Sequence, residues 1–293
     1  MWYIAAMKKL LLCVVMGLAF CMPAAVHAQT VREQQILALQ AQIKQLQLLL
    51  TDMVLQQDTS AGSYIAVDLT TGAIISAKNS TGQFPIASIT KLMNAVVATE
   101  NNDLVNAIAL TSDMLKPQGY SPSLFLGAVV AGRDLLRASL VQSTNDAAEA
   151  LAHTAGPEIF IGKMNQKAKD LGMVDTHFED AHGLSLQNRS TAGDLAKLMA
   201  YIYQNHPEIL ATTKDTDFWL PDPTGRLLKF KNLNVFYQSP GFIGGKTGYL
   251  TEARQSIASV FNVGGKPVAI IVLYSKYRQA DMANILEFVT KAR

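Results

Sequence analysis

Three short motifs in the sequence contain residues whose types and spacing suit nucleophilic chemistry. The first is Ser88-Ile89-Thr90-Lys91, which runs directly into a predicted helix. Residues three apart share one face of a helix, so the Lys91 amine can reach the Ser88 hydroxyl. A neutral or partly desolvated amine could remove the hydroxyl proton, and the helix N-terminus favours the negative charge that develops. The plainer alternative is a helix-capping Ser88 beside a solvated Lys91.

The second motif is Ser143-Thr144-Asn145, which follows a helical run. On a loop, a hydroxyl and a carboxamide two residues apart could relay a proton and hold a substrate amide. A serine and an asparagine that merely end a helix are the alternative. About one S-x-N and one S-x-x-K are expected by chance in a chain of this length, so neither motif is decisive alone.

The third motif, Lys246-Thr247-Gly248, lies on a predicted strand. A cation and a hydroxyl beside an open strand edge suit a carboxylate, and the edge backbone can pair with an extended peptide. Gly248 would let that peptide approach closely. A K-[ST]-G match arises by chance in only about one chain in ten, so this motif is the most specific of the three.

The elements that must position these motifs indicate an α+β domain. Two β-rich runs around a glycine-containing turn predict a hairpin over residues 64–77. Helical periodicity dominates between residues 89 and 193, and strand patterns return before a terminal helix. The expected helices are 91–100, 132–155, 158–171 and 279–291, and the later strands are 241–249, 255–263 and 267–275. Strands at both ends predict one antiparallel sheet built from both ends of the domain, flanked by helices with a helical subdomain.

Residues 1–28 are typical of a secretory signal peptide, with a basic start, an apolar run from Leu10 to Val26 and a small-residue cleavage site. An uncleaved membrane anchor is the alternative, although the run is short for a span and contains Pro23. We expect an exported protein in the periplasm or on the outer face of the cytoplasmic membrane. Cys13 and Cys21 both lie in this segment, so a cleaved product would have neither a disulfide nor a Cys-ligated metal.

Composition and charge narrow the function classes. The chain has 293 residues, of which 49% are hydrophobic and 16% charged, which allows a sizeable core in one or two domains. Its formal net charge is +2, but Lys8 and Lys9 supply this excess, so the exported part is neutral. A neutral balance gives no electrostatic support for a nucleic-acid partner.

Residues 29–60 form a predicted helical stalk and linker, and residues 61–293 form the domain. Between residues 31 and 57 the sequence lacks Gly and Pro and has apolar residues spaced alternately by three and four. This seam consists of Ile36, Leu39, Ile43, Leu46, Leu50 and Met53. The seam fits two alternatives. One is self-association as a short coiled coil, and the other is packing on the domain or on a membrane surface.

The three motifs occur in the order S-x-x-K, S-x-N, K-T-G, each in a suitable local context. In this the sequence resembles the penicillin-recognising serine enzymes, and more narrowly the D-alanyl-D-alanine carboxypeptidase family of low-molecular-weight penicillin-binding proteins. The narrower resemblance covers the whole domain. It rests on the segments PIASITKLM at 85–93, THFEDAHGL at 176–184, STAGDLA at 190–196 and GGKTGY at 244–249.

The resemblance implies that Ser88 is the acylated nucleophile and Lys91 its base. Ser143 would pass the proton to the leaving D-alanine, and Asn145 would orient the substrate amide. The substrates would be peptidoglycan peptides ending in D-Ala-D-Ala. β-Lactams would inhibit covalently by acylating Ser88, because their strained amide mimics the D-Ala-D-Ala bond. No metal and no organic cofactor is implied.

The same resemblance places substrate binding on the third motif. Lys246 and Thr247 would bind the terminal carboxylate beside Gly248. The oxyanion hole would consist of the backbone N–H groups of Ser88 and Tyr249, which point at charge that exists only in the tetrahedral intermediate.

Some residues depart from the family pattern. The family often has an arginine where this chain has Gly193, so Arg189 or Arg254 is expected to replace it in carboxylate binding. His177 and His182 suggest a zinc site or a triad, but no H-E-x-x-H spacing is present, and the family makes them structural.

Three alternatives to a carboxypeptidase follow. The chain stops after the terminal helix, which resembles the endopeptidase branch that cleaves peptidoglycan crosslinks. A serine β-lactamase shares all three motifs, but an E-x-x-L-N segment, which would supply a deacylating carboxylate, is missing. The third alternative is an inactive envelope scaffold that binds partners through residues 31–57, against which the intact Ser88 and Lys91 argue.

Overall fold

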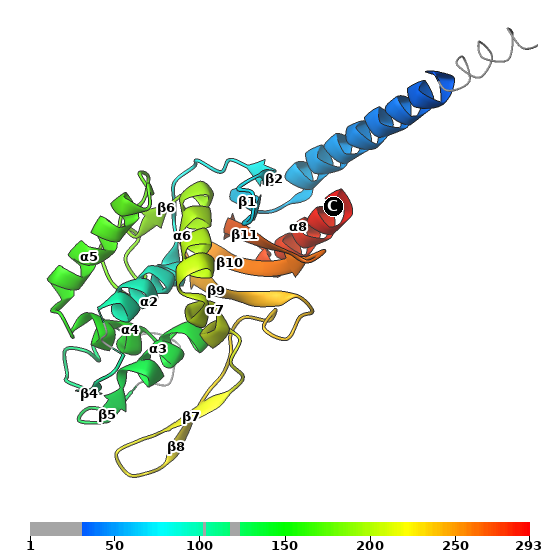
Figure 1. Ribbon diagram of the computed structural model, residues 1–293. Coiled ribbons are helices and arrows are strands. Elements are labelled where there is room, and N and C mark those ends of the chain that lie inside the picture. The colour runs from blue at the N-terminus through cyan, green and yellow to red at the C-terminus, as the bar shows by residue number, and fades with distance from the viewer. Residues whose placement is uncertain (1–30, 102–103, 118–123) are drawn as a thin grey trace, which may run out of the picture. The chain divides into compact units, whose positions relative to one another are not determined.

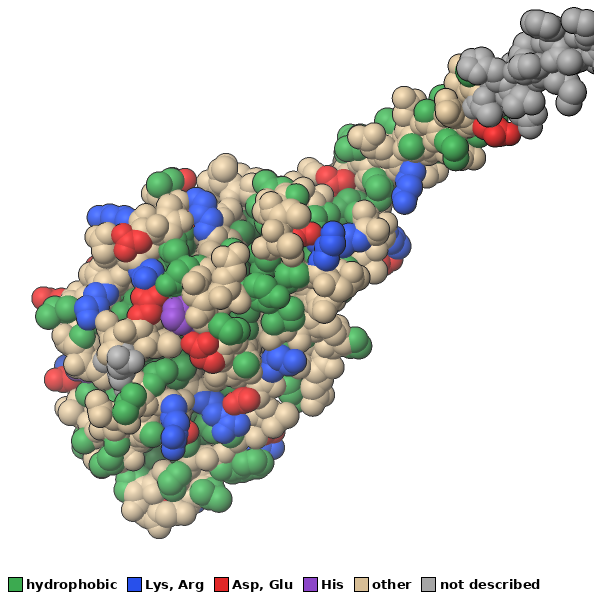
Figure 2. All heavy atoms as spheres, in the orientation of Figure 1, with side chains coloured by type: hydrophobic (Ala, Val, Ile, Leu, Met, Phe, Trp, Pro, Cys, Tyr) green, Lys and Arg blue, Asp and Glu red, His purple; other side chains and the backbone are tan. Residues whose placement is uncertain are grey.

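The computed structural model describes residues 31–101, 104–117 and 124–293, so the predicted signal peptide lies outside the described residues. The chain divides into two units, residues 1–54 and residues 55–293. Residues 31–54 are helical, and apolar side chains are exposed along this helix (Figure 2). Within the described ranges, no helix combines the length and the apolar character that crossing a membrane requires.

A five-stranded antiparallel sheet forms the centre of the second unit, in the order β2-β1-β11-β10-β9 (Figure 1). Its strands are β1 (Ser63–Asp68), β2 (Ile74–Lys78), β9 (Phe242–Leu250), β10 (Arg254–Val263) and β11 (Lys266–Ser275). β1 pairs with β11, with Ile65 opposite Ile271, so the two ends of the domain meet in one sheet. The predicted α+β fold is therefore confirmed, and β9 is an edge strand.

The two faces of the sheet belong to different cores. Successive residues of a strand point to opposite faces, so β11 contributes to both. Ile270 and Val272 pack in a cluster with the apolar residues of α8 (Arg278–Ala292), whereas Ile271 and Leu273 join the larger core on the helical side. The near-continuous apolar sequence of β11 is explained by this burial on both faces.

Helix α2 (Thr90–Glu100) is the centre of the helical layer, where it contacts α3, α4, α5 and α7. Every residue from Thr90 to Ala98 is buried, as expected for a helix surrounded by neighbours. Lys91 in its first turn is thereby carried into the interior. The other helices of the layer are α3 (Gly132–Val141), α4 (Asn145–Ala152), α5 (Pro157–Asp170), α6 (Ala192–Asn205) and α7 (Pro207–Thr213).

Three two-stranded sheets complete the described part of the domain. They are β3 (Phe84–Pro85) with β6 (Arg189–Ser190), β4 (Ala107–Ala109) with β5 (Val129–Ala131), and β7 (Phe218–Pro221) with β8 (Leu227–Phe230). The first pair joins the segment before the S-x-x-K motif to the segment before α6, and so fixes where α2 begins.

The single helix predicted over residues 132–155 is wrong, because the chain breaks there into α3 and α4. Ser143 adopts a φ of 63°, a left-handed conformation that an α-helix cannot continue through. Thr144 then ends α3, since both its N–H and its hydroxyl donate to the carbonyl of Ala138. Asn145 therefore begins α4 rather than lying on a loop.

Candidate active site

Ser88 lies on a short 3-10 turn, Ala87–Ile89, that leads into α2. The φ of Ala87 is 49°, an uncommon conformation for a residue with a side chain and one that is often found at functional sites. Ile89, not Ser88, occupies the N-cap position of α2. The Lys91 side chain is buried, and its Nζ donates to the Ser88 Oγ at 3.0 Å. The alternative of a capping serine beside a solvated lysine is therefore wrong.

The Lys91 amine has two further partners. Its Nζ donates to the Asn145 Oδ1 at 2.7 Å and to the carbonyl oxygen of His182. A neutral amine has two N–H bonds and one lone pair, so these two acceptors can take both hydrogens and leave the lone pair for the Ser88 hydroxyl. Burial lowers the pKa of Lys91 from 10.5 to about 7, while the charges of Asp180 and Asp146 oppose that decrease. The amine is thus a competent base near neutral pH.

Ser143 and Lys246 form a second pair, on the sheet side of the site. The Lys246 Nζ donates to the Ser143 Oγ at 2.8 Å and to the Thr247 carbonyl at 2.9 Å. Burial lowers the pKa of Lys246 well below its usual value, and the neighbouring charges of Lys91 and Arg278 lower it further. At its left-handed φ, Ser143 thus contacts β9 from the junction between α3 and α4.

Gly248 allows β9 to lie directly against the turn that carries Ser88. A Cβ at this position would lie 2.8 Å from the Ile86 carbonyl oxygen and 3.1 Å from the Ser88 amide nitrogen. The strand that carries Tyr249 therefore passes beside the Ser88 N–H. An oxyanion hole formed by the Ser88 and Tyr249 amides stays a prediction, with which this close approach of β9 to Ser88 is consistent.

A cavity of about 500 Å³ opens above these groups. It is lined by Ser88, Gln142, Ser143, Asn145, Gly183, Leu184, Leu233, Thr247, Gly248, Tyr249, Leu250, Thr251 and Arg278. Six of the eight residues that the sequence singled out line this cavity. The other two, Lys91 and Lys246, are buried and hydrogen-bonded to lining serines. The structure therefore brings all eight residues together from α2, the α3–α4 junction and β9.

Arg278, at the start of α8, is the one charged side chain among the cavity-lining residues in the described part of the chain, and sequence reasoning did not single it out. Its Nη1 donates to the Gly248 carbonyl at 2.8 Å, which fixes the guanidinium beside the K-T-G strand. The two arginines expected there lie elsewhere: Arg189 donates to the Gln83 carbonyl, and Arg254 covers the ring of Tyr274. No motif pointed to Arg278, because its distance from β9 depends on how β11 returns the chain to the site.

A serine hydroxyl beside a buried amine at the edge of a cavity is suited to acyl transfer through a serine ester. This chemistry and the fold agree with what comparisons with known proteins find. The family described as D-alanyl-D-alanine carboxypeptidase matches residues 51–276. The chain therefore belongs to that family and is a serine-type DD-peptidase, as the sequence predicts.

Relatives of both specificities are similar to this chain. A D-alanyl-D-alanine endopeptidase of Escherichia coli (strain K12) is 35% identical over 248 residues, which are 80% of this chain and 78% of the relative. A D-alanyl-D-alanine carboxypeptidase of Mycobacterium tuberculosis is 31% identical, over 76% of this chain and 77% of the relative. The crystal structure of a D-alanyl-D-alanine carboxypeptidase from M. tuberculosis H37Rv aligns with a TM-score of 0.74 and 28% identity, over 79% of this chain and 91% of that one.

Proposed function

We propose that this chain is a D-Ala-D-Ala carboxypeptidase that acts on peptidoglycan stem peptides through an acyl-enzyme on Ser88. The observation that carries the proposal is the Lys91 amine, 3.0 Å from the Ser88 Oγ, with a pKa lowered to about 7 and two other acceptors for its hydrogens. These features suit a general base, since a base works best when its pKa is near the working pH.

In the proposed reaction the Ser88 Oγ attacks the carbonyl carbon of the penultimate D-alanine, and its proton moves to Lys91. The N–H groups of Ser88 and Tyr249 stabilise the oxyanion. As the C–N bond breaks, the proton reaches the leaving amine through Ser143, and an ester on Ser88 remains. Water then hydrolyses this ester and restores the serine hydroxyl.

Substrate binding is assigned to the remaining residues of the cavity. Asn145 orients the peptide amide, and Lys246, Thr247 and Arg278 together bind the terminal carboxylate. A guanidinium binds a carboxylate with two hydrogen bonds, which makes Arg278 a suitable replacement for the arginine absent at position 193. The edge of β9 pairs with the extended peptide.

Cleavage of peptidoglycan crosslinks is a second candidate, supported by the similarity to the E. coli endopeptidase. A β-lactamase is disfavoured, because the cavity-lining residues in the described part of the chain include no aspartate or glutamate that could activate water for rapid deacylation. A penicilloyl ester on Ser88 should therefore be long-lived.

Labelled penicillin distinguishes these possibilities. The purified chain should bind the label stably, and Ser88→Ala should abolish labelling with an unchanged melting temperature. Rapid loss of label would indicate a β-lactamase, and no labelling an inactive scaffold. A D-Ala-D-Ala pentapeptide and a crosslinked dimer, supplied in parallel, identify the bond that is cut. Release of D-alanine from the pentapeptide is the expected result.

We also propose that residues 1–28 direct export to the periplasm or the outer face of the cytoplasmic membrane, and that residues 31–57 pair with a second copy as a short coiled coil. Ile36, Leu39, Ile43, Leu46, Leu50 and Met53 are 47–66% exposed, and isoleucine alternating with leucine along a heptad seam favours two strands. Sedimentation of the chain with and without residues 29–57 tests the pairing. A monomer in both cases would leave packing on a membrane surface as the alternative.

A further inference from the structure

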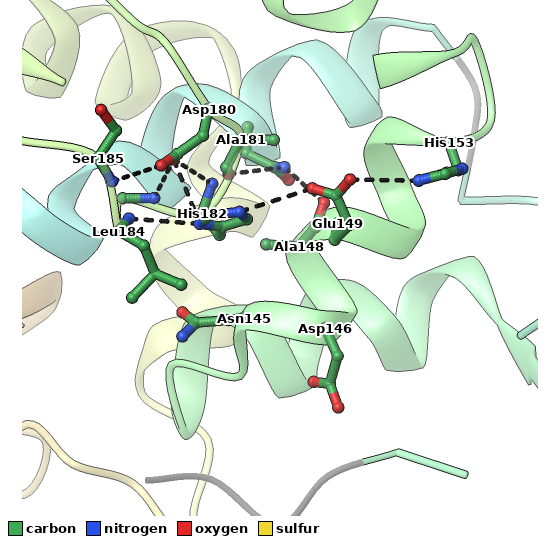
Figure 3. A network of polar contacts seen from close by, with 12 residues as sticks. Asn145, Asp146, Ala148, Glu149, His153, Asp180, Ala181, His182, Leu184 and Ser185 are labelled. Atoms are coloured by element: carbon green, nitrogen blue, oxygen red, sulfur yellow. Dashed lines mark hydrogen bonds and ion pairs between the residues drawn. The ribbon is translucent and has the colours of Figure 1, made fainter. Parts of the chain in front are cut away.

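A loop to which sequence reasoning assigned no catalytic role, residues 180–185, lies against the Lys91 amine. Its Asp180 carboxylate accepts hydrogen bonds from three backbone N–H groups, those of His182 at 3.0 Å, Ser185 at 2.6 Å and Gly183 (Figure 3). A single carboxylate therefore sets the course of the chain over residues 180–185. In this conformation the His182 carbonyl points at Lys91 and accepts a hydrogen bond from the Lys91 Nζ.

The loop is also fixed to the 3-10 turn Ala87–Ile89 that carries Ser88, called the nucleophile turn below. Asn188 is fully buried, and its Nδ2 donates both to the Asp180 Oδ1 at 2.8 Å and to the Thr90 Oγ1 at 3.0 Å, at the start of α2. Gly183 has a φ of 91°, and a Cβ there would lie 2.1 Å from the Ala87 carbonyl oxygen. The loop and the turn are thus packed backbone to backbone.

The imidazole of His182 supports the loop from its other side. Burial lowers its pKa to about 4, so the ring is neutral at pH 7. Its Nδ1 lies 3.3 Å from both the Leu184 backbone nitrogen and the Asp180 Oδ1, and its Nε2 lies 3.7 Å from the Glu149 Oε2. Glu149 also contacts His153 on α4, as Figure 3 shows. His182 acts on Lys91 through its backbone carbonyl.

We propose that Asp180 is a positioning residue for acyl transfer, which holds the His182 carbonyl where it takes one N–H of Lys91 and so directs the lone pair of the amine at Ser88. This inference rests on the proposed function of Ser88 and Lys91. Asn145 takes the second N–H. When the carbonyl is displaced, the amine can rotate and its lone pair no longer points at the serine hydroxyl.

Asp180 has a second, separable effect on the same amine. Among the charged groups around Lys91, Asp180 and Asp146 raise its pKa, which burial lowers. Loss of the Asp180 charge therefore lowers the pKa of Lys91 further. A residue that only stabilised the fold would change the amount of active protein and would leave the pH dependence of the reaction in place.

The test is the rate of acylation by labelled penicillin as a function of pH, measured on the full chain. We expect the wild-type rate to rise through a pH of about 7 to a plateau. In Asp180→Asn the plateau should fall about 100-fold, since a displacement of 1 Å can cost that much, and the rise should move to lower pH. Asp180→Glu keeps the charge but cannot hold the same three amides, so its plateau should fall while its rise stays near the wild-type pH.

Glu179→Gln is the matched control. It makes the same charge change in the neighbouring residue, whose side chain is 59% exposed. It should change neither the plateau rate of acylation nor the pH at which the rate rises. If Asp180→Asn does not fold, the plateau rate of Asp180→Glu alone tests the inference, which requires that this rate falls. Wild-type rates and an unmoved pH profile in a folded Asp180 variant would overturn this inference alone. Failure of the wild-type chain to label at Ser88 would overturn the proposed function as well.

Discussion

Lys91 and Lys246 are both buried in the same site, yet the helical side and the sheet side surround them with different groups. Lys91 on α2 faces two oxygen acceptors in addition to Ser88, and the carboxylates of Asp180 and Asp146 oppose the effect of burial on its pKa. Lys246 on β9 faces the Ser143 hydroxyl and a carbonyl, and its charged neighbours, Lys91 and Arg278, are cations.

This difference assigns different tasks to the two lysines. Because carboxylates compensate part of the desolvation, the pKa of Lys91 is about 7, and its amine can both take and return a proton near neutral pH. Lys246 has no such compensation, and its pKa is lowered well below the usual value. A substrate carboxylate would supply the missing negative charge. The helical side is therefore suited to proton transfer, and the sheet side is suited to binding an anion.

The largest expected effect is the loss of the base in Lys91→Met. General base catalysis contributes about 10²- to 10⁴-fold, so acylation by penicillin should fall about 1,000-fold, and the residual rate should not rise through pH 7. Stopped-flow labelling across pH 6–9 measures both. Lys163→Met, at an exposed position on α5, is the control. A rate within tenfold of the wild type would show that another group removes the serine proton.

Two glycines that hold the helical side and the sheet side against the nucleophile turn provide the next test. Gly183→Ala combines a φ of 91° with a contact of 2.1 Å, so we expect a loss of about 3 kcal/mol in the free energy of unfolding. Gly248→Ala, with a contact of 2.8 Å to the Ile86 carbonyl, should cost about 1–2 kcal/mol but should slow acylation by moving β9 away from the Ser88 amide.

Urea unfolding and labelling rates separate these two outcomes. Gly156→Ala is the control for backbone strain alone, because its φ is 87° and no atom lies within 4 Å of the new Cβ. It should cost about 1 kcal/mol and leave acylation unchanged. Equal losses of stability at Gly156 and Gly183 would contradict the close packing of the loop against the turn.

Sequence reasoning identified the residues of the three motifs but not the groups that support them. The strands β9, β10 and β11 follow one another in the chain, and their apolar runs, bounded by turn residues, are visible in the sequence. The Lys91 amine donates to the backbone carbonyl of His182, and a backbone contact of this kind cannot be predicted from the residue type. Arg278 reaches the cavity only because β11 and α8 return the chain to it. The left-handed φ of Ser143 and the contact of its hydroxyl with Lys246 are features that helical periodicity could not show.

Lys246→Met should have a smaller effect than Lys91→Met, and mainly on binding. Loss of a hydrogen bond to a charged group costs about 1.5–3 kcal/mol, so the KM for a D-Ala-D-Ala peptide should rise about 10- to 100-fold, with a smaller change in kcat. Because an arriving carboxylate raises the pKa of Lys246, binding should also take up protons. Calorimetry on Ser88→Ala in two buffers of different ionisation enthalpy measures this uptake.

Arg278→Gln is the matched variant for this measurement. An arginine stays charged throughout, so its loss should weaken binding without changing the proton uptake. Proton uptake that persists in Ser88→Ala/Lys246→Met would place the titrating group elsewhere, and it would remove the distinction drawn between the two lysines.

The smallest effect concerns the pH dependence of stability, and its sign follows from the lowered pKa values. The folded chain holds Lys91 with a pKa of about 7, whereas the unfolded chain holds it at its ordinary 10.5. Between these values the unfolded state binds more protons, so stability rises with pH, by at most about 1.4 kcal/mol per pH unit for one lysine. Below pH 7 both states are protonated, and Lys91 contributes no slope.

Lys91→Met should therefore flatten the rise in stability between pH 7 and pH 10, measured by urea unfolding. The slope is a better test than the absolute stability, because methionine leaves the acceptors of Asn145 and His182 without the amine while also removing a costly buried charge. Lys246→Met should also reduce the rise in stability below pH 10.5, because burial and the neighbouring cations lower the pKa of Lys246 in the folded chain. An unchanged slope in either variant would mean that the missing lysine keeps its ordinary pKa in the folded chain, and the task that its lowered pKa suggests would then require another cause.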